Sequence, residues 1–217
     1  TMSSIVTPLA VSYYASGDLK SMARQMARAV RFVSLGMSIP LATVCGIAVP
    51  FLGWWLGPEC KVLYPLVWWL LAHQVVTCAV EPLYSINMAA NKMSVPALVT
   101  VAGGVLKVAL SIALVKLTPL GIYGVAIAGF CAFVLKNTLF TPWYAARTIH
   151  VSSWPFYKAM VPSIVFFGGI SMGALRLTRV IDMHGFVQIA AVVALVFGVS
   201  VVGAYYLGIS RDDREFL

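Results

Sequence analysis

Three ionisable residues lie inside long apolar stretches of the sequence, where a charge needs a chemical reason: Glu81, Lys107 and Lys136. Counted from the same end of its span, each is about ten to twelve residues deep. At ~1.5 Å per residue, that depth is near the middle of a ~30 Å hydrocarbon layer. A charge there is unfavourable by about 2.5–3.5 kcal/mol on insertion scales unless it faces a partner or water. We therefore expect the three residues to line one polar chamber within a membrane.

Two lysines and one carboxylate leave a net positive charge, which favours an anionic ligand such as a phosphate or diphosphate. In this interpretation Lys107 and Lys136 bind substrate, and Glu81 balances their charge or couples transport to an ion. The alternative is that Glu81 pairs with one lysine and only ties two helices together. Pro82 follows Glu81 directly and is expected to kink its helix, because proline removes a helical hydrogen bond.

The composition places these residues in a polytopic membrane protein. Hydrophobic residues make up 61% of the 217 and charged residues only 10%, whereas a soluble domain carries about 25% charge. A helix satisfies its own backbone in lipid, and segments of about ten residues with alternating polarity, which indicate a β-barrel, are absent. We expect an all-α fold, a polytopic bundle of transmembrane helices in the cell membrane.

Six spans are predicted, with connections too short to form a soluble domain. They cover residues 32–56, 62–90, 95–117, 121–146, 157–175 and 186–207. By region, we expect the end of a truncated transmembrane helix at 1–15 and a cytoplasmic amphipathic basic helix at 16–31. Four spans follow within 32–146, and two additional spans with a cytoplasmic tail within 147–217. The opening apolar run is shorter than the ~20 residues of a span, so we expect the chain to be part of a longer protein.

The basic segment before the first full span has two faces at helical spacing. Its apolar face comprises Leu19, Met22, Met26 and Val30. Its basic face comprises Lys20, Arg24, Arg28 and Arg31. Such a helix is expected to lie in the headgroup plane, with its basic face toward anionic membrane lipids. The alternative is a solvated connector that carries ordinary positive-inside charges.

Lysine and arginine are distributed unequally between the two ends of the spans, which predicts the orientation. Nine lie on the side assigned to the cytoplasm: Lys20, Arg24, Arg28, Arg31, Lys92, Arg147, Lys158, Arg211 and Arg214. Four lie on the other side: Lys61, Lys116, Arg176 and Arg179. Because these charges flank spans and form no continuous stripe, the formal charge of +8 does not indicate nucleic-acid binding.

The sequence gives no positive sign of catalysis. The four cysteines are widely spaced, with no CxxC pair or His/Cys cluster that would indicate a zinc site or a disulfide framework. No nucleophile–base arrangement, catalytic carboxylate pair or phosphate-binding loop is present. We expect neither an enzyme nor a metal or cofactor site.

Several short motifs, in their order, resemble the oligosaccharide flippases of the multidrug/oligosaccharidyl-lipid/polysaccharide exporter superfamily. They are Tyr14-Ala15-Ser16-Gly17-Asp18, the basic helix ending at Arg31, Trp55-Leu56-Gly57-Pro58-Glu59, the turn at Asn87 to Asn91, Leu120-Gly121-Ile122-Tyr123-Gly124-Val125-Ala126, and Tyr144 to Arg147. The resemblance implies a MATE-like fold of two six-helix lobes. This chain would then be the end of one helix and four further helices of the C-terminal lobe, plus two extra helices.

By the same resemblance, the expected function is to move a lipid-diphosphate-linked oligosaccharide across the cytoplasmic membrane by alternating access, for polysaccharide biosynthesis. The coupling ion is left open between H⁺ and Na⁺. Three other functions stay open. One is a multidrug or cation antiporter of the same fold, which would favour more acidic cavity residues. The others are an integral-membrane glycosyltransferase, polymerase or ligase, which generally needs a sizeable loop outside the membrane, and a non-transporting membrane subunit, which would not need charges at matched depth.

Overall fold

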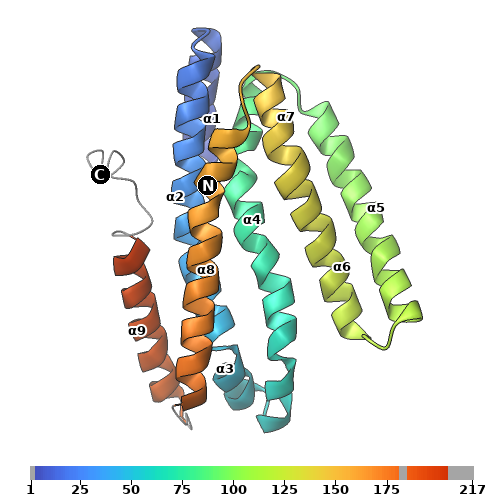
Figure 1. Cartoon of the computed structure of the whole chain (residues 1–217), viewed down its shortest axis with the longest axis vertical. Coiled ribbons are helices and arrows are strands. Elements are labelled where there is room, and N and C mark those ends of the chain that lie inside the picture. Colours follow the sequence, from blue (N-terminus) through green and yellow to red (C-terminus); the bar gives the residue numbers. More distant parts are fainter. Residues whose placement is uncertain (1–2, 181–184, 205–217) are drawn as a thin grey trace. The chain divides into compact units, whose positions relative to one another are not determined.

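The computed structural model describes residues 3–180 and 185–204, and this part of the chain is helical, without strands. The expected all-α fold is confirmed. In chain order the elements are α1 (Ser3–Ala15), α2 (Leu19–Gly46), α3 (Ala48–Trp55), the 3₁₀ helix η1 (Pro58–Leu63), α4 (Tyr64–Ala89), α5 (Ser94–Leu117), α6 (Ile122–Leu135), the π-helical turn η2 (Lys136–Phe140), α7 (Thr141–Thr148), α8 (Trp154–Val180) and α9 (Phe186–Gly203) (Figure 1).

Within residues 3–180 and 185–204, six helical stretches are long and apolar enough to cross a membrane, the number that the sequence predicts. They are Leu19–Gly46, Pro58–Ala89, Ser94–Leu117, Ile122–Thr148, Trp154–Thr178 and Phe186–Gly203. Most bounds agree with the predicted spans within a few residues, and the first differs most. The predicted tail, with Arg211 and Arg214, lies outside the described residues.

The chain forms two compact units. Unit 1 comprises Thr1–Ser34 and Val76–Val161, and unit 2 comprises Leu35–Val75 and the chain from Pro162 onward. The boundaries fall within α2, α4 and α8, so each of these helices contributes one part to each unit. The regions expected from the sequence, 1–15, 16–31, 32–146 and 147–217, divide the chain along its sequence. The two units are defined by contacts in space and combine segments that are distant in sequence, so the expected regions stay a prediction.

The core of unit 1 joins the first part of α2 to α4, α7 and α8. Met22, Met26 and Val30 are fully buried there, in one cluster with Leu83 of α4 and Phe156 of α8. Spacing of four residues places the α2 side chains on one face of the helix, as the sequence predicts.

The structure differs from the expected separate surface helix at 16–31. Leu19 begins a helix that continues without a break to Gly46, so the basic segment is the first part of a span-length helix. Its methionine face contacts protein and not lipid. The predicted break before this helix is present: the Ser21 backbone N–H donates to Asp18 Oδ1 over 3.1 Å, as at a helix N-cap.

In unit 2, α2 ends where a proline interrupts the helical hydrogen bonds. Pro50 has no N–H to donate to the carbonyl of Gly46, four residues earlier, and the backbone turns at Ile47. The Thr178 hydroxyl of α8 shares its hydrogen between the Gly46 oxygen, at 3.3 Å, and the Leu175 carbonyl of its own helix, at 3.0 Å. The Trp68 indole of α4 donates to the neighbouring Cys45 carbonyl over 3.0 Å. Side chains from two other helices therefore satisfy the carbonyls at this break.

Helices α4 and α7 of unit 1 end in the same backbone motif. At α7, His150 N–H donates to the Arg147 carbonyl and Val151 N–H to that of Ala146, the paired bonds of a Schellman cap. At α4 the corresponding bonds run from Asn91 to Met88 and from Lys92 to Asn87. His150 and Asn91 both have φ of 53°, a left-handed conformation more usual for glycine.

Candidate functional site

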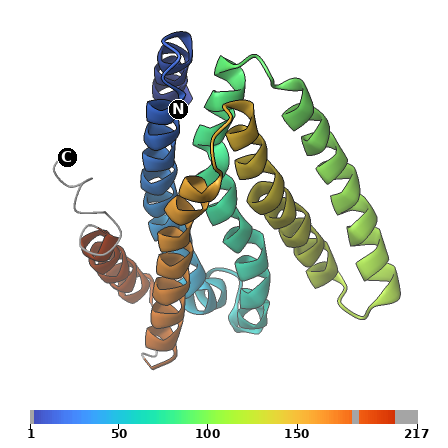
Figure 2. The ribbon, with the colours of Figure 1, turned by 45° about the horizontal axis from the view of Figure 1, so that its top comes forward.

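Both lysines of the predicted chamber lie where α5 packs against α6 in unit 1. These helices are antiparallel neighbours joined by a short turn, which both views of the ribbon show (Figures 1 and 2). Lys107 belongs to α5, and Lys136 begins the π-helical turn η2 that follows α6. Each is partly buried.

Each lysine lies across a glycine of the opposite helix. A β-carbon added to Gly129 would lie 3.3 Å from Cε of Lys107, and one added to Gly103 would lie 3.8 Å from Cδ of Lys136. The missing side chains leave the space that the two aliphatic stems occupy. The sequence shows Gly103 only as part of a small-residue patch, and this reciprocal packing is not readable from it.

Each ammonium group lies near the face of an aromatic ring. Lys107 Nζ is 5.3 Å from the ring centroid of Phe133, and Lys136 Nζ is 5.7 Å from that of Tyr84. Such cation–π contacts stabilise by about 0.5–2 kcal/mol, more when water is excluded. An aromatic face supplies no negative charge, so the amino group of either lysine can still bind an anion.

Glu81 lies on the face of α4 that meets this region. Thr77, Glu81 and Tyr84 follow each other at intervals of four and three residues, which places them on one side of the helix. Thr77 accepts a hydrogen bond of 3.0 Å from Asn137 Nδ2, and Tyr84 lies under Lys136. Glu81 is exposed, and no ion pair joins it to either lysine in the described part of the chain. The structure thus gives no support to the alternative in which Glu81 only ties two helices together.

The π-helical turn positions Lys136. The backbone N–H of Thr141 donates to the carbonyl of Lys136, five residues earlier, where an α-helix would use the residue four earlier. Pro142 follows, and its ring would clash with the carbonyl of residue 138 in a regular helix. Such turns are frequent at functional sites. The Thr141-Pro142 pair is the sequence signal for it, and the prediction of an uninterrupted span missed it.

Asn137, in the same turn, is 1% exposed and has only part of its hydrogen bonding satisfied. Its Nδ2 binds Thr77, but its Oδ1 has no hydrogen-bond partner among the described residues. A buried polar atom without a partner is unfavourable by about 1–3 kcal/mol. Sequence reasoning did not single out Asn137, which is a polar group next to Lys136 still able to accept a hydrogen bond.

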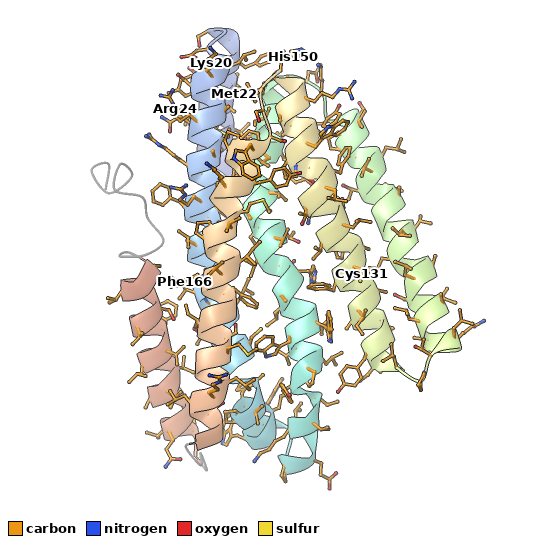
Figure 3. The ribbon with its side chains drawn as sticks, in the orientation of Figure 1. Lys20, Met22, Arg24, Cys131, His150 and Phe166 are labelled. Carbon is orange, nitrogen blue, oxygen red and sulfur yellow. The ribbon has the colours of Figure 1, made fainter. Side chains whose placement is uncertain are left out.

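The four predicted membrane-surface residues lie on the first part of α2. Lys20 and Arg24 are exposed, at the end of unit 1 where Figure 3 also shows His150. Arg28 and Arg31 are partly buried and have interactions within the protein. Lipid contact by these four residues stays a prediction. Among the described residues, no group of three His, Cys, Asp or Glu is placed to hold a metal ion.

Comparison with known proteins gives one informative relative. Over 220 residues the chain is 29% identical to the "uncharacterized membrane protein EpsK" of Bacillus subtilis strain 168. The match covers 100% of this chain and 43% of EpsK, so the chain spans less than half the length of that relative. No protein family's sequence profile matches the chain, and no solved structure does.

The relative and the six candidate spans agree on the broad class. The protein is a multi-pass membrane protein. Within it, the described part of unit 1 contains the three ionisable residues that the sequence placed in mid-span, on α4, α5 and the α6–η2 junction.

Proposed function

We propose that this protein is a flippase that moves a lipid-diphosphate-linked oligosaccharide across the cytoplasmic membrane by alternating access. One observation carries the proposal: Lys107 and Lys136 both lie where α5 packs against α6, and no carboxylate pairs with either one in the described structure. Two such cations are unfavourable in a membrane protein unless they face water or a partner, and an anionic substrate would be such a partner. A diphosphate supplies that charge, and its oxygens accept hydrogen bonds from ammonium groups.

In this proposal Lys107 and Lys136 attract the diphosphate, and Glu81 balances charge or couples substrate movement to H⁺ or Na⁺. The exposed carboxylate of Glu81 is available to an ion, because no lysine occupies it. The sequence resemblance to oligosaccharide flippases supports the substrate class. We propose a transport role without catalysis, with lipid-linked oligosaccharide as the partner and no nucleic acid.

A test is to replace both lysines by alanine in the gene that encodes the protein and to measure surface polysaccharide. We expect the double variant to lose surface polysaccharide while its amount in the membrane stays the same, because the diphosphate would meet no cation. Lys116→Ala is the matched control, since Lys116 is exposed in the last turn of the same helix. Wild-type amounts of surface polysaccharide in the double variant would contradict the proposal.

The exposed Glu81 also gives a reason to test the multidrug or cation antiporter as a second function. A cationic substrate would need that carboxylate and would gain nothing from the lysines. Glu81→Gln would then abolish resistance to cationic drugs, whereas the double lysine variant would keep it. The flippase proposal predicts no change in drug resistance for either variant.

A further inference from the structure

A second cationic feature of unit 1 lies at the end of α7, apart from the lysines of the α5–α6 packing. It is a groove of about 370 Å³, lined by Trp143, Ala146, Arg147, His150, Val151 and Ser153. Arg147 and His150 are exposed, and none of the six lining residues is acidic. The groove therefore offers a guanidinium, an imidazole and a hydroxyl to an anion.

The guanidinium of Arg147 in this groove is positioned by the indole ring of Trp143. The guanidinium carbon of Arg147 lies 5.2 Å from the ring centroid of Trp143. A guanidinium on an aromatic face keeps its planar set of donors and loses less side-chain entropy when it binds a phosphate. Phosphate, like carboxylate, is an anion that such a fork of N–H groups binds bidentately.

The backbone of the groove is fixed as well. His150 occupies the left-handed position of the Schellman cap of α7, which sets the direction in which the chain leaves the helix. Figure 3 places His150 at the end of unit 1 that also carries Lys20 and Arg24. Lys92 follows α4 and Lys158 is near the start of α8. In the predicted orientation, this is the end that faces the negatively charged leaflet surface.

An apolar stripe leads from the groove along the exposed side of the same span. Leu135, Leu139 and Trp143 recur at every fourth position, and 52%, 59% and 47% of their respective surfaces are exposed. Arg147 continues the series at the groove. Twelve helical residues measure roughly 18 Å, close to the ~15 Å hydrocarbon depth of one leaflet. A stripe of that length with a cation at its end fits a lipid, whose acyl chain would contact the stripe and whose phosphate would contact the cation. A soluble phosphate would contact only the groove.

We propose that this surface binds one anionic phospholipid. The phosphodiester binds Arg147 in the groove, with His150 and Ser153 as further hydrogen-bonding partners, and one acyl chain lies along Leu135, Leu139 and Trp143. The site is independent of the proposed transport, and it differs from the basic face of α2 that the sequence suggested for lipid contact.

The test uses the full chain, purified in a mild detergent, with native mass spectrometry during titration of phosphatidylglycerol or phosphatidylcholine. Wild type is expected to retain one phosphatidylglycerol in preference to phosphatidylcholine. Arg147→Gln should weaken that binding by about tenfold, since a charge-assisted bidentate contact is lost. Arg147→Lys, which keeps the charge but not the fork, should fall between the two. Lys116→Gln, which removes an exposed cation in the last turn of α5, should bind like wild type.

Two further arms separate a lipid from a soluble anion. Leu139→Gln should weaken binding of long-chain phosphatidylglycerol but leave a dihexanoyl analogue unaffected, because only the long chain reaches the stripe. Excess inorganic phosphate should not displace the long-chain lipid. The proposal is overturned if Arg147→Gln retains wild-type binding, if phosphatidylcholine binds equally well, or if inorganic phosphate competes fully. Near-ultraviolet circular dichroism of each variant shows whether it is folded.

Discussion

The two units use polar side chains inside their helices in different ways. In unit 1, three of the described bonds between helices join side chain to side chain: Asn137 to Thr77, Thr148 to Asn87, and Thr7 with Ser85. In unit 2, three of the described bonds join side chain to backbone: Thr178 to the Gly46 carbonyl, Trp68 to that of Cys45, and Ser171 to that of Ala42. The three ionisable residues at mid-span belong to unit 1.

The difference distinguishes hydrogen bonds that satisfy backbone carbonyls, in unit 2, from hydrogen bonds that surround a candidate binding site, in unit 1. In unit 2, the Gly46 carbonyl loses the N–H donor that a residue other than Pro50 would supply, and it accepts from the Thr178 hydroxyl, which is shared with the Leu175 carbonyl. In unit 1, the pairs hold helices together while Lys107, Lys136 and Glu81 keep their charges available. The four predictions below test this contrast, from the largest expected effect to the smallest.

The largest effect is expected in unit 2, where α2 and α8 approach closely. A β-carbon on Gly46 would overlap the β-carbon of Ala174, and neither atom can swing aside. Gly46→Ala should therefore lower the free energy of unfolding by about 3 kcal/mol, at the upper end of overpacking effects. Thermal unfolding in detergent measures it. Gly36→Ala, on the same helix in open space, is the control and should not be destabilised. Equal stability of the two variants would show that the close packing is not present.

The second largest effect on stability is expected from the hydrogen bond that the Gly46 carbonyl accepts where α2 ends. Thr178→Val keeps the shape of the side chain but removes the donor to the Gly46 carbonyl, which should lower the free energy of unfolding by about 1 kcal/mol. The matched variant is Thr100→Val, because the Thr100 hydroxyl bonds only within its own helix, to Pro96. If Thr178→Val lowers the free energy of unfolding no more than Thr100→Val does, the bond to the Gly46 carbonyl does not stabilise the fold.

The Asn137–Thr77 pair is expected to contribute less, because such pairs in membranes average only about 0.6 kcal/mol. A double-mutant cycle with Asn137→Ala and Thr77→Val isolates this coupling from the other contacts of each residue. Since the pair lies beside Lys136, we also expect each single variant to weaken binding of a diphosphate probe. Additive stability changes together with wild-type binding would mean that the pair neither couples α4 to η2 nor positions the lysine.

Gly129 should have the smallest effect on stability and a clear effect on binding. The end of the Lys107 side chain must move by a few tenths of an ångström to admit a β-carbon on Gly129, which a flexible chain does easily. Gly129→Ala should thus change the free energy of unfolding by less than about 0.5 kcal/mol, yet weaken binding of a prenyl diphosphate by moving Lys107 from Phe133. Gly104→Ala, in open space on α5, should bind like wild type. Wild-type binding by Gly129→Ala would remove Gly129 from the site.

The sequence predicts the helical class and the six spans because long apolar runs and flanking charges are local signals. The predicted span 95–117 and helix α5 (Ser94–Leu117) differ by one residue. The sequence does not decide what the first part of α2 contacts, since Met22 and Met26 are equally suited to contact lipid or protein. Only the packing of α4 and α8 against them decides between the two.

The candidate site was predictable in its charges but not in its geometry. Depth along each span is enough to single out Glu81, Lys107 and Lys136. The glycines beneath the lysines and the π-helical turn at Lys136 depend on contacts between distant segments, such as Asn137 with Thr77, sixty residues apart. No local pattern encodes such a contact, although Thr141-Pro142 marks where a regular helix is disfavoured.

The central claim is that Lys107 and Lys136 form one binding site for a diphosphate. It is tested most directly by titrating the purified protein with undecaprenyl diphosphate and, as a neutral comparison, undecaprenol. We expect wild type and Lys116→Ala to bind the diphosphate, and the Lys107→Ala/Lys136→Ala protein to bind it at least about tenfold more weakly, as loss of charge-assisted contacts predicts. Undecaprenol should bind all three equally. Undiminished diphosphate binding by the double variant would contradict the claim.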